Sequence, residues 1–278
     1  MFWFFVPTRS LSRLVGRCMR HPASRRFIPL YIRTYGVDVD PVQRSLNEFE
    51  HMLAFFTRTL RPTARPICPD ENILICPVDG TITMGGIITE EGKIVAKRGT
   101  YTFSELVAGD QQENLVGQFL GGKFVVLYLS PKDYHRVHVP LHGTLRCVIH
   151  IPGALRPVRT WRVERFPRTL VYNERVVVVL KTAFGPVVLV FVGAMNVGSI
   201  RLAPFPTLVT NQKSQGIRVE KCSIPLHKGE ELGHFEMGST VVLCLPAKFG
   251  PWIRPLERGM GIQMGQSMAY CRPPRSSH

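Results

Sequence analysis

Residues 176–180 read Val-Val-Val-Val-Leu, and residues 187–191 read Val-Val-Leu-Val-Phe. The segment between them ends in Phe184-Gly185-Pro186, which is typical of a turn. Two short apolar runs joined by such a turn predict a β-hairpin. Because neither run alternates with polar residues, we expect both faces of the hairpin to be buried.

Similar strand-like runs occur at 124–129 and 240–245, and Gly and Pro punctuate the chain from about residue 70 onward. Before that point the apolar residues recur at helical spacing. The sequence therefore predicts an α+β fold, with a helical N-terminal region (residues 1–66, here called the arm) followed by a predominantly antiparallel β body (residues 67–278).

The chain of 278 residues carries 35 basic and 20 acidic residues, a formal charge of +15. Seven of the arginines lie in the first 36 residues, which contain no lysine and no acid. A nucleic-acid-binding domain more often spreads its cations over a folded face. We therefore expect an anionic membrane as the partner and no nucleic acid.

The start of the arm has the pattern of an amphipathic helix that ends at Pro22. Residues 2–6, Phe-Trp-Phe-Phe-Val, precede it. A helix lying in a membrane interface fits this pattern. A helix packed on its own protein and an organelle transit peptide are the alternatives. The predicted apolar face holds Leu11, Leu14, Val15, Cys18 and Met19, and the cationic face holds Arg9, Arg13, Arg17 and Arg20.

Two more helical segments are expected in the arm. Residues 27–35 are apolar and end at Gly36, and Pro29 marks either a kink or the true start of that helix. Leu46, Phe49, Leu53 and Phe56 form a third helical stripe. No apolar stretch approaches the roughly 20 residues that a membrane span needs.

The seven cysteines are scattered and form no C-x-x-C pair. This pattern indicates neither a zinc site nor a disulfide framework, and it favours free thiols in a reducing compartment.

Three segments carry residues suited to catalysis. Asp79 lies in Pro77-Val78-Asp79-Gly80, His135 and His138 lie in Tyr134-His135-Arg136-Val137-His138, and Ser239 lies in Gly238-Ser239-Thr240. Each segment alone also fits an ordinary turn or surface site. Together they supply a hydroxyl nucleophile, a base and an orienting acid.

The spacing of these residues adds two expectations. On extended backbone, His135 and His138 would point to opposite faces, so we expect no shared metal. No G-x-S-x-G elbow is present. Because Gly238 has no side chain, the Ser239 hydroxyl is placed to attack the carbonyl immediately before it.

The sequence resembles the phosphatidylserine decarboxylases of the membrane-associated bacterial and mitochondrial type over nearly its whole length. The run Asp133-Tyr134-His135-Arg136-Val137-His138 and the later Gly238-Ser239-Thr240 are the most specific motifs, although Met237 stands where that family usually has Leu. The other matching segments are 46–49, 56–58, 77–80, 129–140, 173–175, 184–186, 192–194, 197–200 and 228–233.

The resemblance implies a proenzyme that cleaves itself between Gly238 and Ser239. Asp79 would orient His138, His138 would take the proton of Ser239, and Ser239 would attack the Gly238 carbonyl. The products would be a β chain, 1–238, and an α chain, 239–278, with Ser239 converted to a covalent pyruvoyl cofactor and no metal. The pyruvoyl ketone would form a Schiff base with phosphatidylserine and release CO2 to give phosphatidylethanolamine. His135 would hold the substrate carboxylate or act as proton donor.

The resemblance also suggests where the protein acts. Segments 11–14 and 35–38 are similar to the start of bacterial members, which favours a mature membrane-docking arm over a transit peptide. We therefore expect a peripheral protein on the cytoplasmic face of the bacterial cell membrane, with phosphatidylserine and the two chains of one precursor as partners; a homo-oligomer is possible. The alternatives are a serine hydrolase using Asp79, His138 and Ser239 on an external ester or peptide, and a membrane-binding module with a degenerate site.

Overall fold

The computed structural model describes residues 8–109, 114–195, 199–208, 210–212, 216–236 and 238–272, with backbone alone for 8–11. The aromatic start at 2–6, Met237, the tail 273–278 and the side chains of Arg9 and Leu11 therefore lie outside the described residues.

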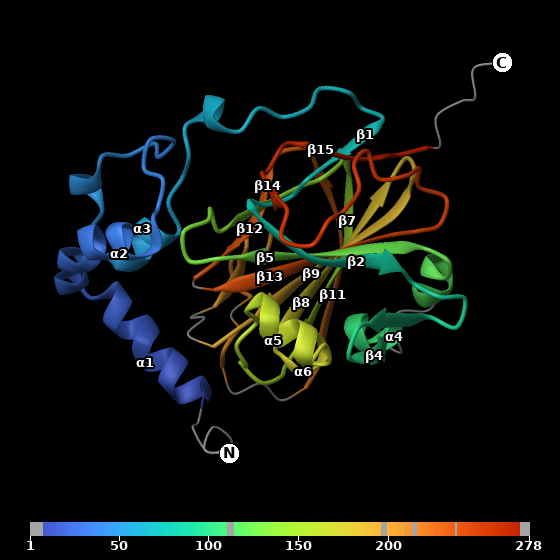
Figure 1. Cartoon of the computed structure of the whole chain (residues 1–278), viewed down its shortest axis with the longest axis horizontal. Coiled ribbons are helices and arrows are strands. Elements are labelled where there is room, and N and C mark those ends of the chain that lie inside the picture. Colours follow the sequence, from blue (N-terminus) through green and yellow to red (C-terminus); the bar gives the residue numbers. More distant parts are fainter. Residues whose placement is uncertain are drawn as a thin grey trace.

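The helices fall into two groups, one in the arm and one beside the sheet (Figure 1). The α-helices are α1 (Thr8–Arg20), α2 (Ile28–Tyr35), α3 (Met52–Phe56), α4 (Phe103–Val107), α5 (Thr160–Arg165) and α6 (Thr169–Tyr172). The 3-10 helices are η1 (Pro22–Phe27), η2 (Leu46–Glu48), η3 (Pro62–Ala64) and η5 (Val116–Phe119).

The body is built on an antiparallel sheet of eight strands in the order β11-β7-β8-β9-β13-β5-β2-β14. A three-stranded sheet, β10-β12-β6, and two strand pairs, β1-β15 and β3-β4, pack around it. The strands are β1 (Ile73–Ile75), β2 (Gly80–Ile87), β3 (Lys93–Ala96), β4 (Gly99–Thr102), β5 (Lys123–Leu129), β6 (Arg136–His138), β7 (Gly143–Ile151), β8 (Arg175–Thr182), β9 (Gly185–Gly193), β10 (Ile200–Leu202), β11 (Arg218–Leu226), β12 (Glu231–Phe235), β13 (Ser239–Leu245), β14 (Gly261–Ile262) and β15 (Ser267–Tyr270).

The predicted hairpin is present and is buried on both faces. Strands β8 and β9 pair in register from Arg175 opposite Val192 to Thr182 opposite Gly185. Val176 and Val178 belong to the core on one face of the sheet, whereas Val177 belongs to the core on the other. The α+β prediction, with a helical N-terminal region and an antiparallel β body, is confirmed.

Helix α1 forms where the sequence predicts it, and it buries only part of the predicted apolar stripe. Ser12, Gly16 and Met19 are buried, while Leu14 is 56% exposed and Cys18 is also exposed. Small residues at positions 12 and 16 let the helix approach its neighbours closely. Of the predicted apolar stripe, Val15 and Met19 therefore pack in the core of the arm, whereas Leu14 and Cys18 face outward.

The other arm helices also differ in part from expectation. Helix α2 begins at Ile28 with Pro29 in its first turn, so Pro29 marks the start of the helix, and Gly36 caps its end with φ of 64°. Residues 46–56 do not form one helix. A capping box of Ser45 and Glu48 caps the start of η2. Helix α3 starts only after His51, whose ring accepts a hydrogen bond from the Ala54 N–H.

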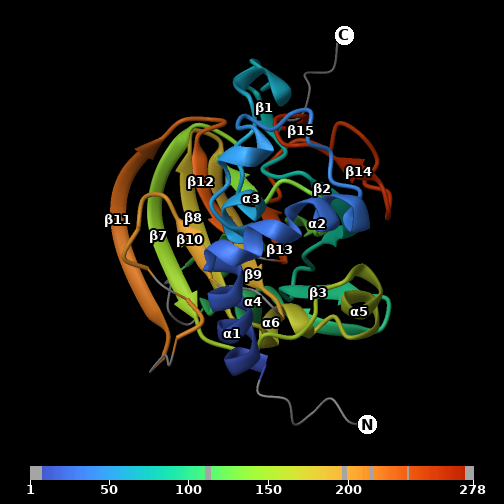
Figure 2. The same cartoon turned by 90° about the vertical axis from the view of Figure 1, so that its left-hand side faces the viewer.

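The arm covers one end of the sheet, as the turned view shows (Figure 2). Tyr31 donates a hydrogen bond to the Pro131 carbonyl at 2.7 Å, and Arg20 forms an ion pair with Glu236. Among the described helices none is long and apolar enough to cross a bilayer. All seven cysteines are free thiols.

Candidate active site

Ser239 is the first residue of β13, in the interior of the main sheet. It pairs with Leu129 of β5 on one side and with Gly193 of β9 on the other. Its hydroxyl is fully buried and has no hydrogen-bond partner. Gly238 has φ of 23°, within the region that favours glycine, and a Cβ there would meet no atom within 4 Å. The bond between the two residues thus joins a partly buried glycine to the first residue of a buried strand.

Gly193, opposite Ser239, is held by two buried polar residues that the sequence analysis assigned no role. The Asn173 side chain donates to the Gly193 carbonyl at 2.8 Å, and the Gly193 N–H donates to the Glu174 carbonyl at 2.9 Å. Asn173 and Glu174 belong to segment 173–175, which the sequence analysis noted as matching the family. The sequence did not indicate that these two residues hold Gly193.

A short loop after β5 carries both histidines to the same region. The carboxylate of Asp133 accepts hydrogen bonds from the Ser130 N–H and hydroxyl, both at 2.7 Å, which closes the loop. The His138 N–H donates to the Pro77 carbonyl at 2.8 Å. This backbone contact places the Pro77–Gly80 segment, and with it Asp79, beside His138.

His135 is fully buried and neutral. Its Nδ1–H donates to the Asp133 carbonyl at 2.8 Å, and its ring lies against Phe56 with the centroids 4.0 Å apart. Burial, followed by the nearby charge of Arg58, lowers the pKa of His135 to about 3. Nε2 is buried without a partner. Because Nδ1 carries the proton, Nε2 presents a free lone pair and can accept a proton.

His138 has partners at both ring nitrogens. Its Nδ1–H donates to the Gly229 carbonyl at 2.8 Å, and its Nε2 accepts from the Tyr134 hydroxyl at 3.1 Å. Burial lowers the pKa of His138, an effect opposed by the Gly229 carbonyl and by the charges of Glu231 and Asp79. His138 is therefore neutral near pH 7, as a general base must be.

Asp79 is nearly buried and is held by Arg65 and Met264. Arg65 Nε lies 2.9 Å from both carboxylate oxygens and Nη2 lies 2.5 Å from Oδ2, while the Met264 N–H donates to Oδ1 at 2.9 Å. Within the described part of the chain, no hydrogen bond joins Asp79, His138 and Ser239 to one another. The structure gathers the predicted residues around one region, and it gives Asp79 a cationic partner that the sequence analysis did not predict.

A cavity of about 430 Å³ opens between the arm and the body next to these residues. Arg58, at 3% exposed, donates from Nη2 to the carbonyls of Lys132 and Asp133 at 2.8 and 3.1 Å. Its Nε and Nη1 are buried without partners. A buried guanidinium with unused N–H groups beside a cavity is suited to bind an anion. Lining residues of the cavity include Arg58, Arg65, Asp79, Lys132, Tyr134 and Gln263.

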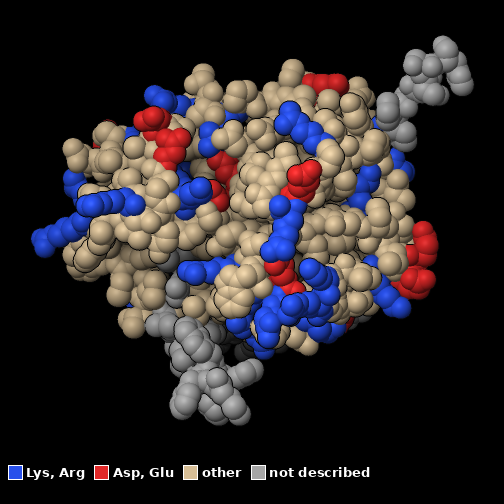
Figure 3. Space-filling view, viewed as in Figure 1, with Lys and Arg blue, Asp and Glu red and all other residues tan. Residues whose placement is uncertain are grey.

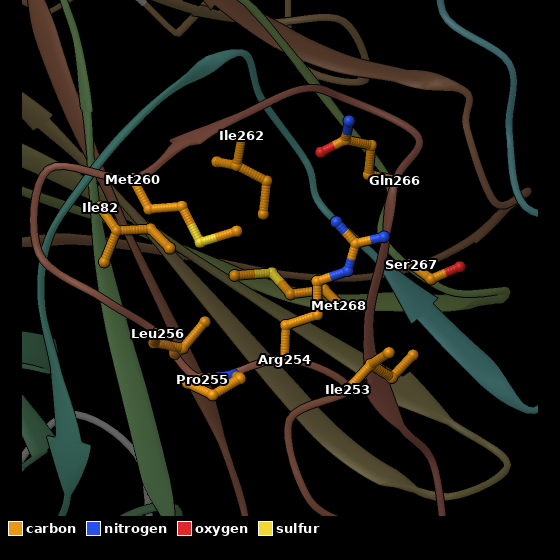
Figure 4. Close-up of a pocket in the computed structure, with 10 residues that line it drawn as sticks. All are labelled: Ile82, Ile253, Arg254, Pro255, Leu256, Met260, Ile262, Gln266, Ser267 and Met268. Atoms are coloured by element: carbon orange, nitrogen blue, oxygen red, sulfur yellow. The ribbon is translucent and has the colours of Figure 1, made fainter.

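A smaller cavity of about 150 Å³ lies on the C-terminal segment and is mostly apolar apart from Arg254, Gln266 and Ser267 (Figure 4). None of the predicted site residues lines it, and we assign it no part in the reaction.

Comparison with known proteins places this arrangement in a family. The family model described as phosphatidylserine decarboxylase matches residues 52–270, which include all of the site residues named above. The chain belongs to the phosphatidylserine decarboxylase family. A phosphatidylserine decarboxylase proenzyme of Brevibacillus brevis is 39% identical over 267 residues, covering 95% of this chain and 94% of that protein. The proenzyme of Pseudomonas aeruginosa is 39% identical over 280 residues, covering 96% and 94%.

Membership of the phosphatidylserine decarboxylase family makes the chain a decarboxylase of the proenzyme type. The high coverage by both relatives extends the match beyond residues 52–270 into the arm.

Proposed function

We propose that the protein is a phosphatidylserine decarboxylase that cleaves itself between Gly238 and Ser239 and carries a pyruvoyl group derived from Ser239. The observation that supports this most directly is the Ser239 hydroxyl, which is buried in the main sheet without a hydrogen-bond partner and directly follows a glycine with positive φ. A buried hydroxyl without a hydrogen bond lowers the stability of the fold, and a catalytic role is one reason why a protein keeps such a group.

In the proposed processing step, the Ser239 oxygen attacks the Gly238 carbonyl carbon and the peptide bond becomes an ester. His138 takes the hydroxyl proton at Nε2, which requires its hydrogen bond with Tyr134 to open, and the Asp79 charge stabilises the protonated ring. Loss of the Cα proton of residue 239 then expels the Gly238 carboxylate. Water replaces the amino group of residue 239, which leaves as ammonia, and the β chain 1–238 and α chain 239–278 result.

In the proposed decarboxylation, the pyruvoyl group supplies a ketone that reacts with the substrate amine and withdraws electrons as CO2 leaves. The residues fit this group, since position 239 is buried and enclosed by β5 and β9. In this step, Nε2 of His135, which has no hydrogen-bond partner, would accept and then donate a proton. Because its pKa is low, His135 must first accept a proton, which the substrate ammonium group gives up before its nitrogen can react, and His135 would later donate this proton to the substrate carbon.

We also propose that Arg58 binds the phosphodiester of the lipid headgroup through its unused N–H groups. A cation on the departing carboxylate would stabilise the ground state and oppose loss of CO2, whereas a cation on the phosphodiester only positions the substrate. Thr81 of β2 lines the same cavity. It pairs with Tyr128 of β5, and Tyr128 pairs with Thr240 of β13, so two strand spacings separate Thr81 from Thr240. Two strand spacings are about 10 Å, so the cavity is close to Ser239.

The arm is the proposed membrane-docking element, on the cytoplasmic face of the bacterial cell membrane. Its exposed apolar side chains include Phe27 at 59% and Leu30 at 61%, next to Arg25 and Arg26. Aromatic and aliphatic side chains beside arginines suit the headgroup boundary of an anionic bilayer.

Intact mass and activity of the purified protein test the proposed function. We expect two chains, ending at Gly238 and beginning at residue 239 with a blocked N-terminus, and release of CO2 from phosphatidylserine. Ser239→Ala should remain one chain and release none. A single uncut chain that hydrolyses an ester or peptide would instead support the serine hydrolase. A single chain without either activity would support a membrane-binding module.

Kinetics of Arg58→Gln test the substrate contact. Loss of hydrogen bonds to a charged group should raise KM on the order of 10-fold or more with a smaller change in kcat. Arg61→Gln is the matched control, because the Arg61 side chain is exposed and donates a hydrogen bond to the Asp40 carbonyl, away from the Lys132 and Asp133 carbonyls that hold Arg58. Equal KM values for the two variants would remove Arg58 from the substrate site.

A further inference from the structure

A second basic surface lies on the body, far in sequence from the arm. Arginine recurs at every third position from 156 to 168, and this stretch contains one acid, Glu164. Figure 3 shows a dense group of Lys and Arg side chains over the place where Figure 1 draws α5. We call this the α5–α6 surface. It comprises Arg156, Arg159, Trp161, Arg162, Arg165, Phe166, Arg168 and Tyr172.

Three aromatic side chains of this surface are left outside the core. Trp161 is 57% exposed, Phe166 is 50% exposed and Tyr172 is 46% exposed. Val163 and Leu170, in contrast, are buried and attach the two helices to the core of the body. The aromatic residues are therefore not needed to hold α5 and α6 in place, and clustered exposed aromatics mark an interaction surface.

The arginines and aromatics of the surface are arranged as pairs. The guanidinium carbons of Arg162 and Arg165 lie 5.5 and 5.8 Å from the centre of the Phe166 ring. Those of Arg156 and Arg168 lie 5.1 and 5.2 Å from the centre of the Tyr172 ring. Phe166 and Tyr172 thus each have two guanidinium groups beside the ring, although Arg168 also forms an ion pair with Glu105. Arginines beside exposed rings suit the region where lipid headgroups meet acyl chains.

The α5–α6 surface and the N-terminal end of α1 lie on one side of the molecule. In both views α5, α6 and the N-terminal end of α1 lie at the bottom of the picture (Figures 1 and 2). We propose that the α5–α6 surface is a second contact with an anionic lipid bilayer, made by the body itself. It rests on the proposed function in one respect, that the substrate is a bilayer lipid. Two contacts on separate parts of the fold would fix the orientation of the site toward the membrane, which one helix cannot do.

Vesicle binding of full-length variants tests this contact separately from the chemistry. The experiment uses the Ser239→Ala chain and vesicles of phosphatidylcholine with phosphatidylglycerol, which is anionic but is not the proposed substrate. Arg159→Gln/Arg165→Gln should weaken binding roughly 30-fold at low salt. Arg146→Gln/Arg218→Gln is the matched control, because these exposed residues lie on β7 and β11, across the molecule from α5 (Figure 2).

Tryptophan fluorescence provides a second readout that does not depend on charge. In a Trp3→Phe/Trp252→Phe background, Trp161 should shift to shorter wavelength on vesicles and be quenched by brominated acyl chains. Equal binding by the two double variants, or an unquenched Trp161, would overturn the proposal. Loss of binding to DNA or to an acidic protein, with vesicle binding unchanged, would likewise overturn it in favour of another partner.

Discussion

At the scale of single residues, the Ser239 hydroxyl and the Nε2 atom of His135 are buried without hydrogen bonds, whereas the equally buried His150 donates from Nε2 to Glu174 at 2.8 Å. The guanidinium of Arg175 is also buried, and every one of its nitrogens is bonded to a carbonyl. Ser239 and His135 are thus unpaired where His150 and Arg175 are paired, although among the described residues the buried hydroxyls of Thr83, Tyr101 and Thr240 also lack partners.

The first prediction concerns the base for processing. His138→Ala should slow cleavage by roughly 100-fold or more, because Ser239 loses its proton acceptor. Since burial lowers the pKa of His138 below 6.5, cleavage by the unaltered chain should be constant from pH 8 to about 6.5 and should fall in more acidic solution. Time courses of intact mass measure both effects. Unimpaired cleavage in His138→Ala, with loss of cleavage in His135→Ala, would transfer the role to His135.

A second prediction concerns stability in acid. The pKa of His135 is about 3 in the folded chain and near 6.5 when unfolded, so the unfolded chain binds the extra proton between these values. The free energy of unfolding should therefore be retained above pH 6.5 and fall by up to ~4 kcal/mol as the pH is lowered toward 3. Urea titrations of Ser239→Ala and Ser239→Ala/His135→Phe at several pH values measure it. The same acid slope in both would show that His135 does not cause the loss.

At the scale of elements, α1 divides its residues between two tasks. Its buried face packs against the arm core, and its exposed face combines Arg13, Leu14, Arg17 and Cys18. Its last residue, Arg20, forms an ion pair with Glu236, which also accepts from Arg201 and lies three residues before Ser239. The helix proposed to meet the membrane is thus attached to the segment that carries the proposed cleavage site.

The third prediction follows from that exposed face. Arg13→Gln/Arg17→Gln should weaken binding to anionic vesicles roughly 30-fold at low salt and much less at high salt, since Coulombic attraction is screened. Vesicle sedimentation at two salt concentrations measures the effect. Because neither side chain is buried, thermal unfolding should be unchanged. Salt-independent loss of binding would argue against an electrostatic role for α1.

At the scale of the whole molecule, the proposed cleavage would cut the chain at the start of an interior strand. All seven residues of β13 are buried, and the strand is paired on both sides along its length. The proposed α chain also supplies β14 and β15, which pair with β2 and β1. The two fragments would therefore share one core.

The fourth prediction is that the fragments stay together after cleavage. Size-exclusion chromatography of the cleaved protein should give one peak containing both chains, and separation should require denaturant, because removing β13 would expose the core on both faces of the sheet. Ser239→Ala, which should remain uncut, is the control for elution volume. Dissociation in native buffer would contradict this account of the fold.

Much of the candidate site was predictable because its residues lie in short sequence motifs. Asp79, His135, His138 and Ser239 were all singled out from residue type and order, and their common role stays a prediction. The structure places the Asp79 segment beside His138, and it places Ser239 opposite Leu129, the last residue before the loop that carries His135. Arg65 and Arg58 were not singled out, since lone arginines carry no spacing signal. Their partners are Asp79 and the Lys132 and Asp133 carbonyls, and those contacts exist only once the arm packs on the body.

Local pattern was sufficient for the strands. An unbroken run of β-branched residues, as in β8, has one favourable outcome, a strand buried on both faces. The arm was harder to predict, because a face that is apolar in sequence can meet either its own protein or a bilayer. Tertiary packing chose Ser12, Gly16 and Met19 for the inside of α1, since small residues allow close approach, and left Leu14 outside. Hydrophobic periodicity favours a helix, as at α1, but residues 46–56 show that it does not ensure one, and the shape of the neighbouring elements decides which face a helix buries.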